Sequence, residues 1–193
     1  MNEDDILNLI KKDKWMMGVL RAAESLNLPD WWIGAGFIRD KVWDFLSEYR
    51  KRTPLNDVDI IYFDKSDFNP DELESYSTKA EDRYQEKLNN LMPDVKWSVT
   101  NQARMHLFHK TNPYKNSEDA LKDWAETATC IGVCLEKGKL ILLAPHGISD
   151  LVNLTARPNS LYKKLYSHDP EVFERRVKEK KWLNKWPKLR III

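Results

Sequence analysis

The stretch that decides the fold begins with Trp32-Ile33-Gly34-Ala35-Gly36-Phe37-Ile38-Arg39-Asp40 and ends with Asp57-Val58-Asp59-Ile60-Ile61-Tyr62-Phe63. Its first part is a short apolar run, a glycine turn and an apolar pattern with helical spacing, which predicts a strand, a turn and a helix. Its last part is rich in β-branched and aromatic residues, which predicts a second strand. Two aspartates open that strand, and the first follows Gly36 by 21 residues.

The glycine turn is a candidate anion-binding site. A strand, a Gly-x-Gly turn and a helix in this order place backbone N–H groups where a phosphate can reach them. Gly34 and Gly36 lack the Cβ atoms that would obstruct this approach, and Ala35 lies between them. Glycines also serve ordinary tight turns, so the turn alone is weak support. A dinucleotide fold is disfavoured, because the third glycine of its pattern would fall at Arg39.

Arg39 is a further phosphate-binding candidate because of its position in the predicted helix. It lies in the first turn, where a cation opposes the positive end of the helix dipole. This position is explained if the guanidinium faces a bound anion. The alternative is an ion pair with Asp40 or another carboxylate. Asp40 suits the first turn electrostatically, so a cap or tether is its simplest role and it remains a weaker candidate.

Asp57 and Asp59 are candidate metal ligands and catalytic residues. On a strand they share one face, with carboxylates about 6–7 Å apart along it. Two oxygen ligands at this spacing can bracket one or two Mg²⁺ ions, and a metal would relieve the repulsion between the two charges. The alternative is a strand that begins with two solvated acids.

The rest of the chain predicts elements on both sides of this stretch. Helices are expected over residues 4–26, from Asn69 to about Leu91, from Ser117 to about Glu126, and from Asp169 to about Leu183. Alternating apolar residues predict a strand from Val95 to Val99 and a hairpin around Lys137-Gly138. We expect an α/β (α+β) fold with a small mixed β-sheet and flanking helices.

The length of 193 residues suits a single domain over 1–193. We expect residues 1–110 to form a core with the turn and the aspartate pair, and residues 111–193 to pack on it as an extension.

Composition narrows the choice of partners and compartment. The net charge of +1 argues against general nucleic-acid binding, and the Lys178–Lys181 run is expected to be a solvated helix face. No apolar run reaches the ~18 residues of a membrane helix, and the acidic N-terminus does not resemble a secretory signal. We expect a cytoplasmic protein in which Cys130 and Cys134 are reduced.

The turn, Arg39-Asp40 and Asp57-Val58-Asp59-Ile60 together resemble the head domain of tRNA CCA-adding enzymes and bacterial poly(A) polymerases, which belong to the DNA polymerase beta-like nucleotidyltransferase superfamily. Two later segments, Asn101–His106 and Ala144–Leu151, are similar to a bacterial family of uncharacterised nucleotidyltransferase-like proteins. The resemblance implies that Asp57 and Asp59 hold Mg²⁺ or Mn²⁺. It also implies that Gly34 and Gly36 cradle the triphosphate of a nucleoside triphosphate, with Arg39 near the phosphates or bracing the loop.

Two departures from the superfamily pattern bear on activity. Ala35-Gly36 replaces the commoner Gly-Gly or Gly-Ser, and the strand expected to carry a third carboxylate has none. Asp94 and Asp150 are weaker candidates for that acid, although Ser149-Asp150 more commonly caps a helix. Asn101 could ligate only as a neutral oxygen, and Arg104 could meet phosphate; a solvated strand-to-helix joint is the alternative for both. Trp31, beside the turn, is the tryptophan we would test for nucleobase contact.

These observations predict a Mg²⁺-dependent nucleotidyltransferase. It would move a nucleoside monophosphate from a nucleoside triphosphate to an acceptor hydroxyl on a small molecule, a protein or an RNA end. The missing third acid supports the alternative of a catalytically degenerate module with the same fold. That module would bind a nucleotide, or bind a partner protein in the manner of an antitoxin.

Overall fold

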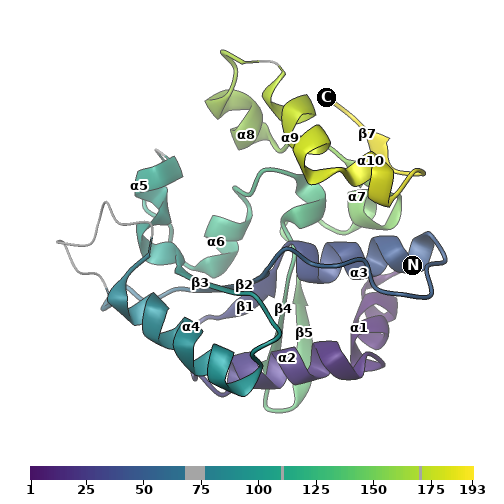
Figure 1. The fold of residues 1–193 in the computed structure, drawn as a ribbon. Helices are drawn as coiled ribbons and strands as arrows, with labels where there is room; N and C mark the ends of the chain where they lie inside the picture. The colour runs from purple at the N-terminus through teal and green to yellow at the C-terminus, as the bar shows by residue number, and fades with distance from the viewer. Residues whose placement is uncertain (68–76, 110, 170) are drawn as a thin grey trace.

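The computed structural model describes residues 1–67, 77–109, 111–169 and 171–193. Its centre is a five-stranded mixed sheet with the strand order β3-β2-β1-β4-β5 (Figure 1). The strands are β1 (Trp32–Gly34), β2 (Val58–Tyr62), β3 (Trp97–Asn101), β4 (Gly132–Glu136) and β5 (Lys139–Leu143). Within this sheet β2 and β3 run parallel, and the other neighbouring pairs are antiparallel. The predicted α/β fold with a small mixed sheet is confirmed.

The short strand β1 occupies the middle of the sheet, so the glycine turn that follows it starts from the core. Ile33 pairs with Ile60 on one side and with Val133 on the other, and its side chain is fully buried. The predicted hairpin is confirmed as β4 and β5. Because both strands lie beyond residue 110 and β4 pairs with β1, the sheet does not divide at the expected boundary between core and extension.

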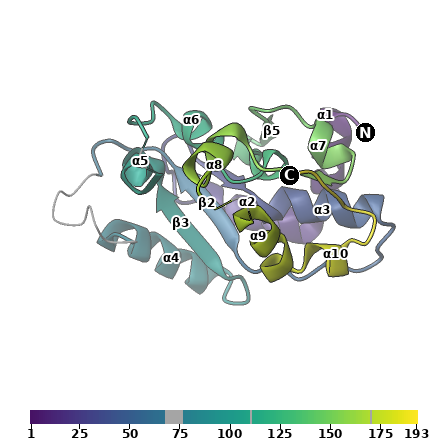
Figure 2. The same ribbon diagram turned by 90° about the horizontal axis from the view of Figure 1, so that it is seen from above.

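Ten α-helices surround the sheet in the described ranges. They are α1 (Glu3–Lys11), α2 (Lys14–Glu24), α3 (Gly36–Leu46), α4 (Lys79–Leu91), α5 (Met105–His109), α6 (Ser117–Leu121), α7 (Ser149–Val152), α8 (Ser160–Leu165), α9 (Val172–Lys180) and α10 (Trp182–Lys185). The last three lie together on the side away from α2 and α4 (Figure 1). Seen from above, α8 and α9 lie over the region where β2 and α3 meet (Figure 2).

The predicted helix over 4–26 is wrong in one respect, because it is two helices that break at Asp13. The Asp13 carboxylate caps α2 by accepting hydrogen bonds from the backbone N–H groups of Trp15 and Met16, at 3.1 Å each. It also forms ion pairs with Lys41 and Arg52. The ion pairs with these two distant residues favour a capped helix start at Asp13 over a continuous helix. The spacing of apolar residues near Asp13 does not indicate either ion pair.

Two other helices are shorter than predicted. The helix that begins at Ser117 ends at Leu121, and the last predicted helix is divided at Lys181, which has φ +54°. The predicted helix start at Asn69 lies outside the described residues. In the described part, α4 begins after Thr78, whose side chain and Glu81 form a capping box.

The C-terminal segment packs back on the sheet domain through two buried tryptophans. Trp182 and Trp186 are both fully buried and meet the Trp43 ring edge-on, with ring centroids 5.9 and 5.0 Å away. Trp186 Nε1 donates a hydrogen bond to Asp44 at 2.8 Å. The last strand, β7 (Arg190–Ile191), pairs in parallel with β6 (Thr155–Ala156). These contacts fix α10 and the residue that follows it against the C-terminal half of α3.

Both cysteines are free and buried, as expected for reduced thiols. Burial raises the pKa of each thiol to about 12. Within the described residues, no helix combines the length and the apolar character that crossing a membrane requires.

Candidate functional site

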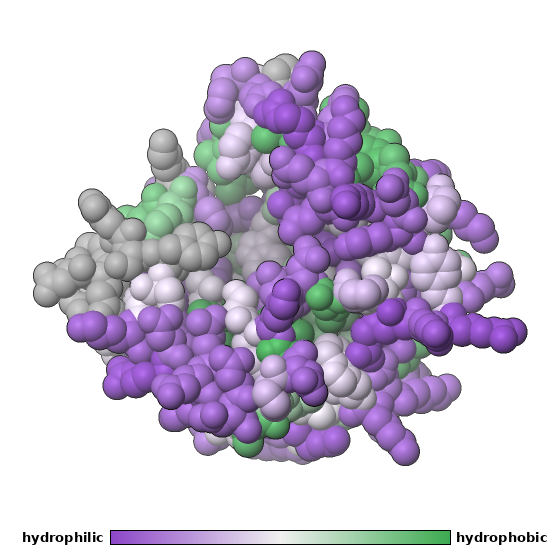
Figure 3. All heavy atoms as spheres, viewed as in Figure 1, coloured by the Kyte–Doolittle hydropathy of each residue, from purple (hydrophilic) through white to green (hydrophobic). Residues whose placement is uncertain are grey.

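A cavity of about 460 Å³ lies between the glycine turn, the start of β2 and the C-terminal helices. The space-filling view shows the surface hollowed beneath α8–α10 (Figure 3). A volume of this order is typical of small-ligand sites, which span roughly 300–1,000 Å³. Most of the residues that the sequence singled out as the main site candidates line this cavity: Ala35, Gly36, Arg39, Asp57 and Asp59.

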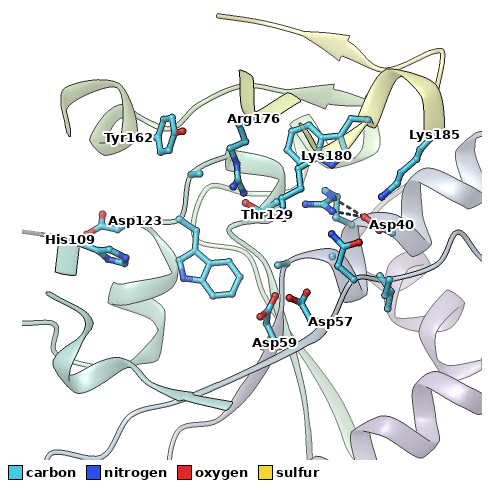
Figure 4. Close-up of a pocket in the computed structure, with 18 of the residues that line it drawn as sticks. Asp40, Asp57, Asp59, His109, Asp123, Thr129, Tyr162, Arg176, Lys180 and Lys185 are labelled. Carbon is cyan, nitrogen blue, oxygen red and sulfur yellow. Dashed lines mark hydrogen bonds and ion pairs between the residues drawn. The ribbon is translucent and has the colours of Figure 1, made fainter. Parts of the chain in front are cut away.

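The floor of the cavity carries the two predicted aspartates. Asp59 lies on β2 opposite Ser98, Asp57 directly precedes that strand, and the Val58 side chain between them is buried in the core. Figure 4 shows the two carboxylates side by side. Burial and the neighbouring Asp57 carboxylate raise the pKa of Asp59 to about 6. No ion pair neutralises either acid among the residues that the structure describes, so their oxygens suit a divalent cation.

The glycine turn contributes backbone to the same cavity. Ala35 and Gly36 line it, and Ala35 has φ +50° and ψ −122°, a conformation that L-residues rarely adopt. Gly36 opens α3, so the positive end of the helix faces the cavity. Gly34 does not line it. A Cβ at position 34 would lie 2.9 Å from Cη2 of Trp124, so any larger residue there would have to displace that indole.

Arg39 lines the cavity and also forms the ion pair that was its alternative role. Its Nε and Nη2 atoms donate to Asp40 Oδ1 at 2.9 and 2.7 Å. The guanidinium carbon lies 5.3 Å from the ring centroid of Trp43 and 5.0 Å from that of Trp182. Asp40 also lines the cavity and orients Arg39, while the two tryptophans restrict it.

The roof of the cavity is cationic and comes from α9 and α10. Arg176, Lys180 and Lys185 line it, and Figure 4 shows them on the side opposite Asp57 and Asp59. The prediction of a solvated face for Lys178–Lys181 is therefore wrong for Lys180, which helps to lower the pKa of Asp59 against the larger effect of burial. Arg176 is already paired with Glu126. The acid floor and the cationic roof face each other across one space.

Four weaker candidates lie outside the cavity. Asn101 is fully buried and bonds to the backbone of Asp64 and Ala103. Arg104 pairs with Glu81 at 2.6 Å, with both side chains almost fully buried. Asp94 is exposed in the turn before β3. Asp150 accepts a hydrogen bond from Thr127 and pairs with Arg157.

Several cavity residues were not singled out from the sequence as binding residues. They are His109, Asp123, Trp124, Tyr162, Tyr166, Arg176, Lys180 and Lys185. Trp31, the tryptophan predicted as a candidate for nucleobase contact, does not line the cavity, whereas Trp124 and Trp182 do. Asp123 adds an acid, but Figure 4 shows it beside His109 and away from Asp57 and Asp59. The described residues contain no group of three His, Cys, Asp or Glu side chains placed to hold a metal ion.

Comparisons with known proteins relate this chain to nucleotidyltransferases. A sequence model of a family described as nucleotidyltransferase matches residues 21–191. An NMR structure described as revealing a CCA-adding enzyme head domain is similar to the chain with a TM-score of 0.80 and 28% identity, over 99% of this chain and 96% of that one. The predicted resemblance to CCA-adding head domains is confirmed.

More distant solved structures share the fold. A CCA-adding enzyme with CTP matches with a TM-score of 0.57 and 13% identity, and a Thermotoga maritima CCA-adding enzyme complexed with tRNA matches with 0.53 and 14%. The match takes in 100% of this chain but 44% and 43% of those enzymes, so the chain spans less than half of their length. No curated protein is similar enough to count as a match.

Proposed function

The chain belongs to this nucleotidyltransferase family, and on that premise we propose that it transfers a nucleoside monophosphate from a nucleoside triphosphate to an acceptor hydroxyl. Asp57 and Asp59 would hold Mg²⁺ or Mn²⁺. The observation that carries the proposal is the cavity itself, in which a pair of acids without an ion pair faces cations across a space of ligand size. A divalent metal would offset the negative charge of the two acids, and a triphosphate would offset the positive charge of the cations.

Each part of the cavity has a role in this proposal. Backbone N–H groups at Ala35 and Gly36 and the N-terminal end of α3 would bind the β- and γ-phosphates. Arg39, Lys180 and Lys185 would offset the charge of the departing pyrophosphate. The bound metal would polarise the α-phosphate and help to align the acceptor oxygen.

The reaction would form a bond between the acceptor oxygen and the α-phosphorus and break the bond to the oxygen that bridges the α- and β-phosphorus atoms. Pyrophosphate would leave, and the acceptor would release its proton. A solved enzyme of this fold holds CTP, which supports a nucleoside triphosphate as substrate. The acceptor could be a small molecule, a protein side chain or an RNA end, and the near-neutral charge disfavours long RNA.

One observation favours a second candidate function, a nucleotide-binding or partner-binding module without turnover. The superfamily pattern includes a third carboxylate, and none lies beside Asp57 and Asp59 in the described part of the chain. Such a module would bind metal and nucleotide in the same cavity but would release no pyrophosphate with any acceptor.

Titration with nucleotides tests the proposal. Each of the four nucleoside triphosphates is added to the protein with and without Mg²⁺ while backbone amide shifts are recorded. We expect metal-dependent shifts at residues 34–40 and 57–59, and at least a tenfold loss of affinity in Asp57→Asn and Asp59→Asn. Asp94→Asn is the matched control, because Asp94 is an exposed acid outside the cavity.

The outcomes separate the two functions. If no nucleotide produces metal-dependent shifts at those residues, the proposed binding site is wrong. Pyrophosphate release in the presence of an acceptor supports transfer. Binding without release across small-molecule, protein and RNA acceptors supports the module without turnover.

A further inference from the structure

The two outer strands of the sheet have different surroundings. β3 and β5 are the outermost strands, so each has one side without a neighbouring strand (Figure 1). On β3 that side is closed by α4: the backbone N–H of Val99 donates to Gln85 at 3.2 Å, and that of Asn101 donates to Glu81 at 2.6 Å. Side chains of one helix therefore satisfy the donors that this edge would otherwise expose.

β5 has no such cover on its outer side. The two-residue turn Lys137-Gly138, with φ +50° and +78°, makes Glu136 and Lys139 a hydrogen-bonded pair. Because such pairs alternate along an antiparallel ladder, the backbone N–H and C=O groups of Leu140 and Leu142 point away from β4. Within the described residues, no backbone or side-chain group hydrogen bonds to them from outside the hairpin. The outer side of β5 is therefore an open edge.

The side chains of β5 do little to protect this edge. Natural sheets commonly protect an exposed edge with charged residues or proline. Lys139, at one end, is the only charged residue of β5, and the strand continues as Leu140-Ile141-Leu142-Leu143. Ile141 is 36% exposed, while Leu140 and Leu142 are partly buried against the core. An apolar edge with unpaired backbone groups favours the addition of another strand.

We propose that this edge pairs with β5 of a second copy of the chain, which joins the two sheets into one ten-stranded sheet. With the two-fold axis at Ile141, Leu140 of each copy lies opposite Leu142 of the other. These are the residues whose backbone groups point outward, so each such pair exchanges two hydrogen bonds.

The same register fits the side chains of the edge. Lys139 lies opposite Leu143 of the second copy, so no two like charges face each other across the pairing. The edge is thus complementary to itself, which favours a second copy over a strand of a different protein. No β5 residue lines the cavity between the glycine turn and the C-terminal helices, so the inference is independent of the proposed function.

Sedimentation velocity over a range of protein concentrations tests the proposal. The five residues of β5 form a smaller contact than a standard protein interface, so we expect a dissociation constant on the order of 1–100 µM. Ile141→Lys places two ammonium groups opposite each other at the axis and should weaken association at least a hundredfold. Leu91→Lys is the matched control, because it makes the same change at an exposed leucine of α4 and should leave the dimer intact.

Cysteine cross-linking tests the register. The background is Cys134→Ser, because Cys134 pairs with Ile141 within the hairpin; Cys130 is buried. Ile141→Cys places the two introduced thiols in a non-hydrogen-bonded pair with Cα atoms about 4.5 Å apart, so we expect disulfide-linked dimers under mild oxidation. In Lys139→Cys the two positions would lie about 13 Å apart along the strands, which is too far for a disulfide.

The outcomes decide the proposal. A wild type that stays monomeric well above the expected dissociation constant overturns it and leaves the edge to a strand of another protein. A dimer that keeps its affinity in Ile141→Lys, or that cross-links as well in Lys139→Cys as in Ile141→Cys, also overturns it. Far-UV circular dichroism shows whether the lysine variants are folded. If Ile141→Lys does not fold, cross-linking decides alone, because Ile141→Cys introduces no charge.

Discussion

At the scale of the single residue, the raised pKa of Asp59 makes the stability of the fold depend on pH. Its pKa is raised from 3.8 to about 6, first by burial and then by Asp57, so the folded protein binds this proton more tightly than the unfolded chain. Without metal, the free energy of unfolding should therefore fall as pH rises from about 4 to about 6, by up to roughly 3 kcal/mol. Urea unfolding at pH 4, 5, 6 and 7 in the presence of a chelator measures this change.

The matched variant for this prediction is Asp59→Asn, which should make the profile between pH 4 and 6 less steep; Asp40, whose pKa burial also raises, still titrates in it. Adding Mg²⁺ at pH 7 should stabilise wild type but not this variant, because the metal binds only the folded carboxylates. Asp13 titrates in a lower window: hydrogen bonds from Arg52 and Lys41 outweigh the effect of burial and lower its pKa to about 2. An unchanged slope in Asp59→Asn would contradict the assignment.

The sequence predicted which residues of the turn and the strand lie together better than it predicted why each residue is there. The sequence indicated that Asp57, Asp59 and Arg39 would lie near one another, and all three line the cavity. Gly34 was interpreted as part of a phosphate cradle, whereas the structure ties its lack of a side chain to the Trp124 ring. Sequence spacing cannot show this, because the indole comes from a distant loop.

At the scale of the element, Arg104 lies after a strand, where a polar residue can either bind a ligand or stabilise the fold. Its pairing with Glu81 joins α4 to the segment after β3, and Glu81 also accepts a hydrogen bond from the Asn101 backbone at 2.6 Å. Arg104→Met should destabilise the protein by about 3–5 kcal/mol, because it leaves a buried carboxylate without its cation. Nucleotide affinity of the folded variant should stay within about twofold of wild type, since Arg104 is absent from the cavity lining.

Urea unfolding and nucleotide titration on the same samples check this prediction. Gln85→Met is a control, since it removes a polar side chain from the same face of α4, where Gln85 accepts a hydrogen bond from the Val99 backbone at 3.2 Å. A variant with wild-type stability and weakened nucleotide binding would instead make Arg104 a phosphate ligand.

Elements with a local signal were predictable, and those that depend on distant partners were not. The strand from Val58 and the hairpin around Lys137-Gly138 follow from β-branched residues, alternation and a turn with two residues at positive φ. The helix break at Asp13 depends on Lys41 and Arg52, and the break at Lys181 needs a left-handed lysine. Neither is visible in hydrophobic spacing.

At the scale of the whole molecule, the cavity is assembled from parts that are far apart in the chain. The floor and turn come from residues 35–59, and the roof comes from α9 and α10, near the end of the sequence. Only the floor and turn carry a sequence motif. His109, Asp123 and Lys180 reach the cavity through packing of loops and helices, so no pattern in the sequence marks them.

This assembly predicts that a bound nucleotide links the floor to the roof. With Mg²⁺ and a nucleoside triphosphate, amide hydrogen exchange should slow at residues 172–185 as well as at 34–40 and 57–59, because the ligand contacts both parts. Lys180→Ala should weaken binding about tenfold and abolish the protection of 172–185. Exposed Lys178, on the same helix, provides the control variant Lys178→Ala. Protection confined to 34–59 would show that the roof takes no part.

The contact between Gly34 and Trp124 also has a consequence for descent. The two positions lie in separate segments yet share one volume, since a methyl group on residue 34 would come within 2.9 Å of the indole. The two positions are therefore coupled: a larger residue at 34 requires the Trp124 ring to move or a smaller residue to replace it. We therefore expect substitutions at positions 34 and 124 to occur together during evolution. A change at either position alters both the glycine turn and the loop that carries Trp124.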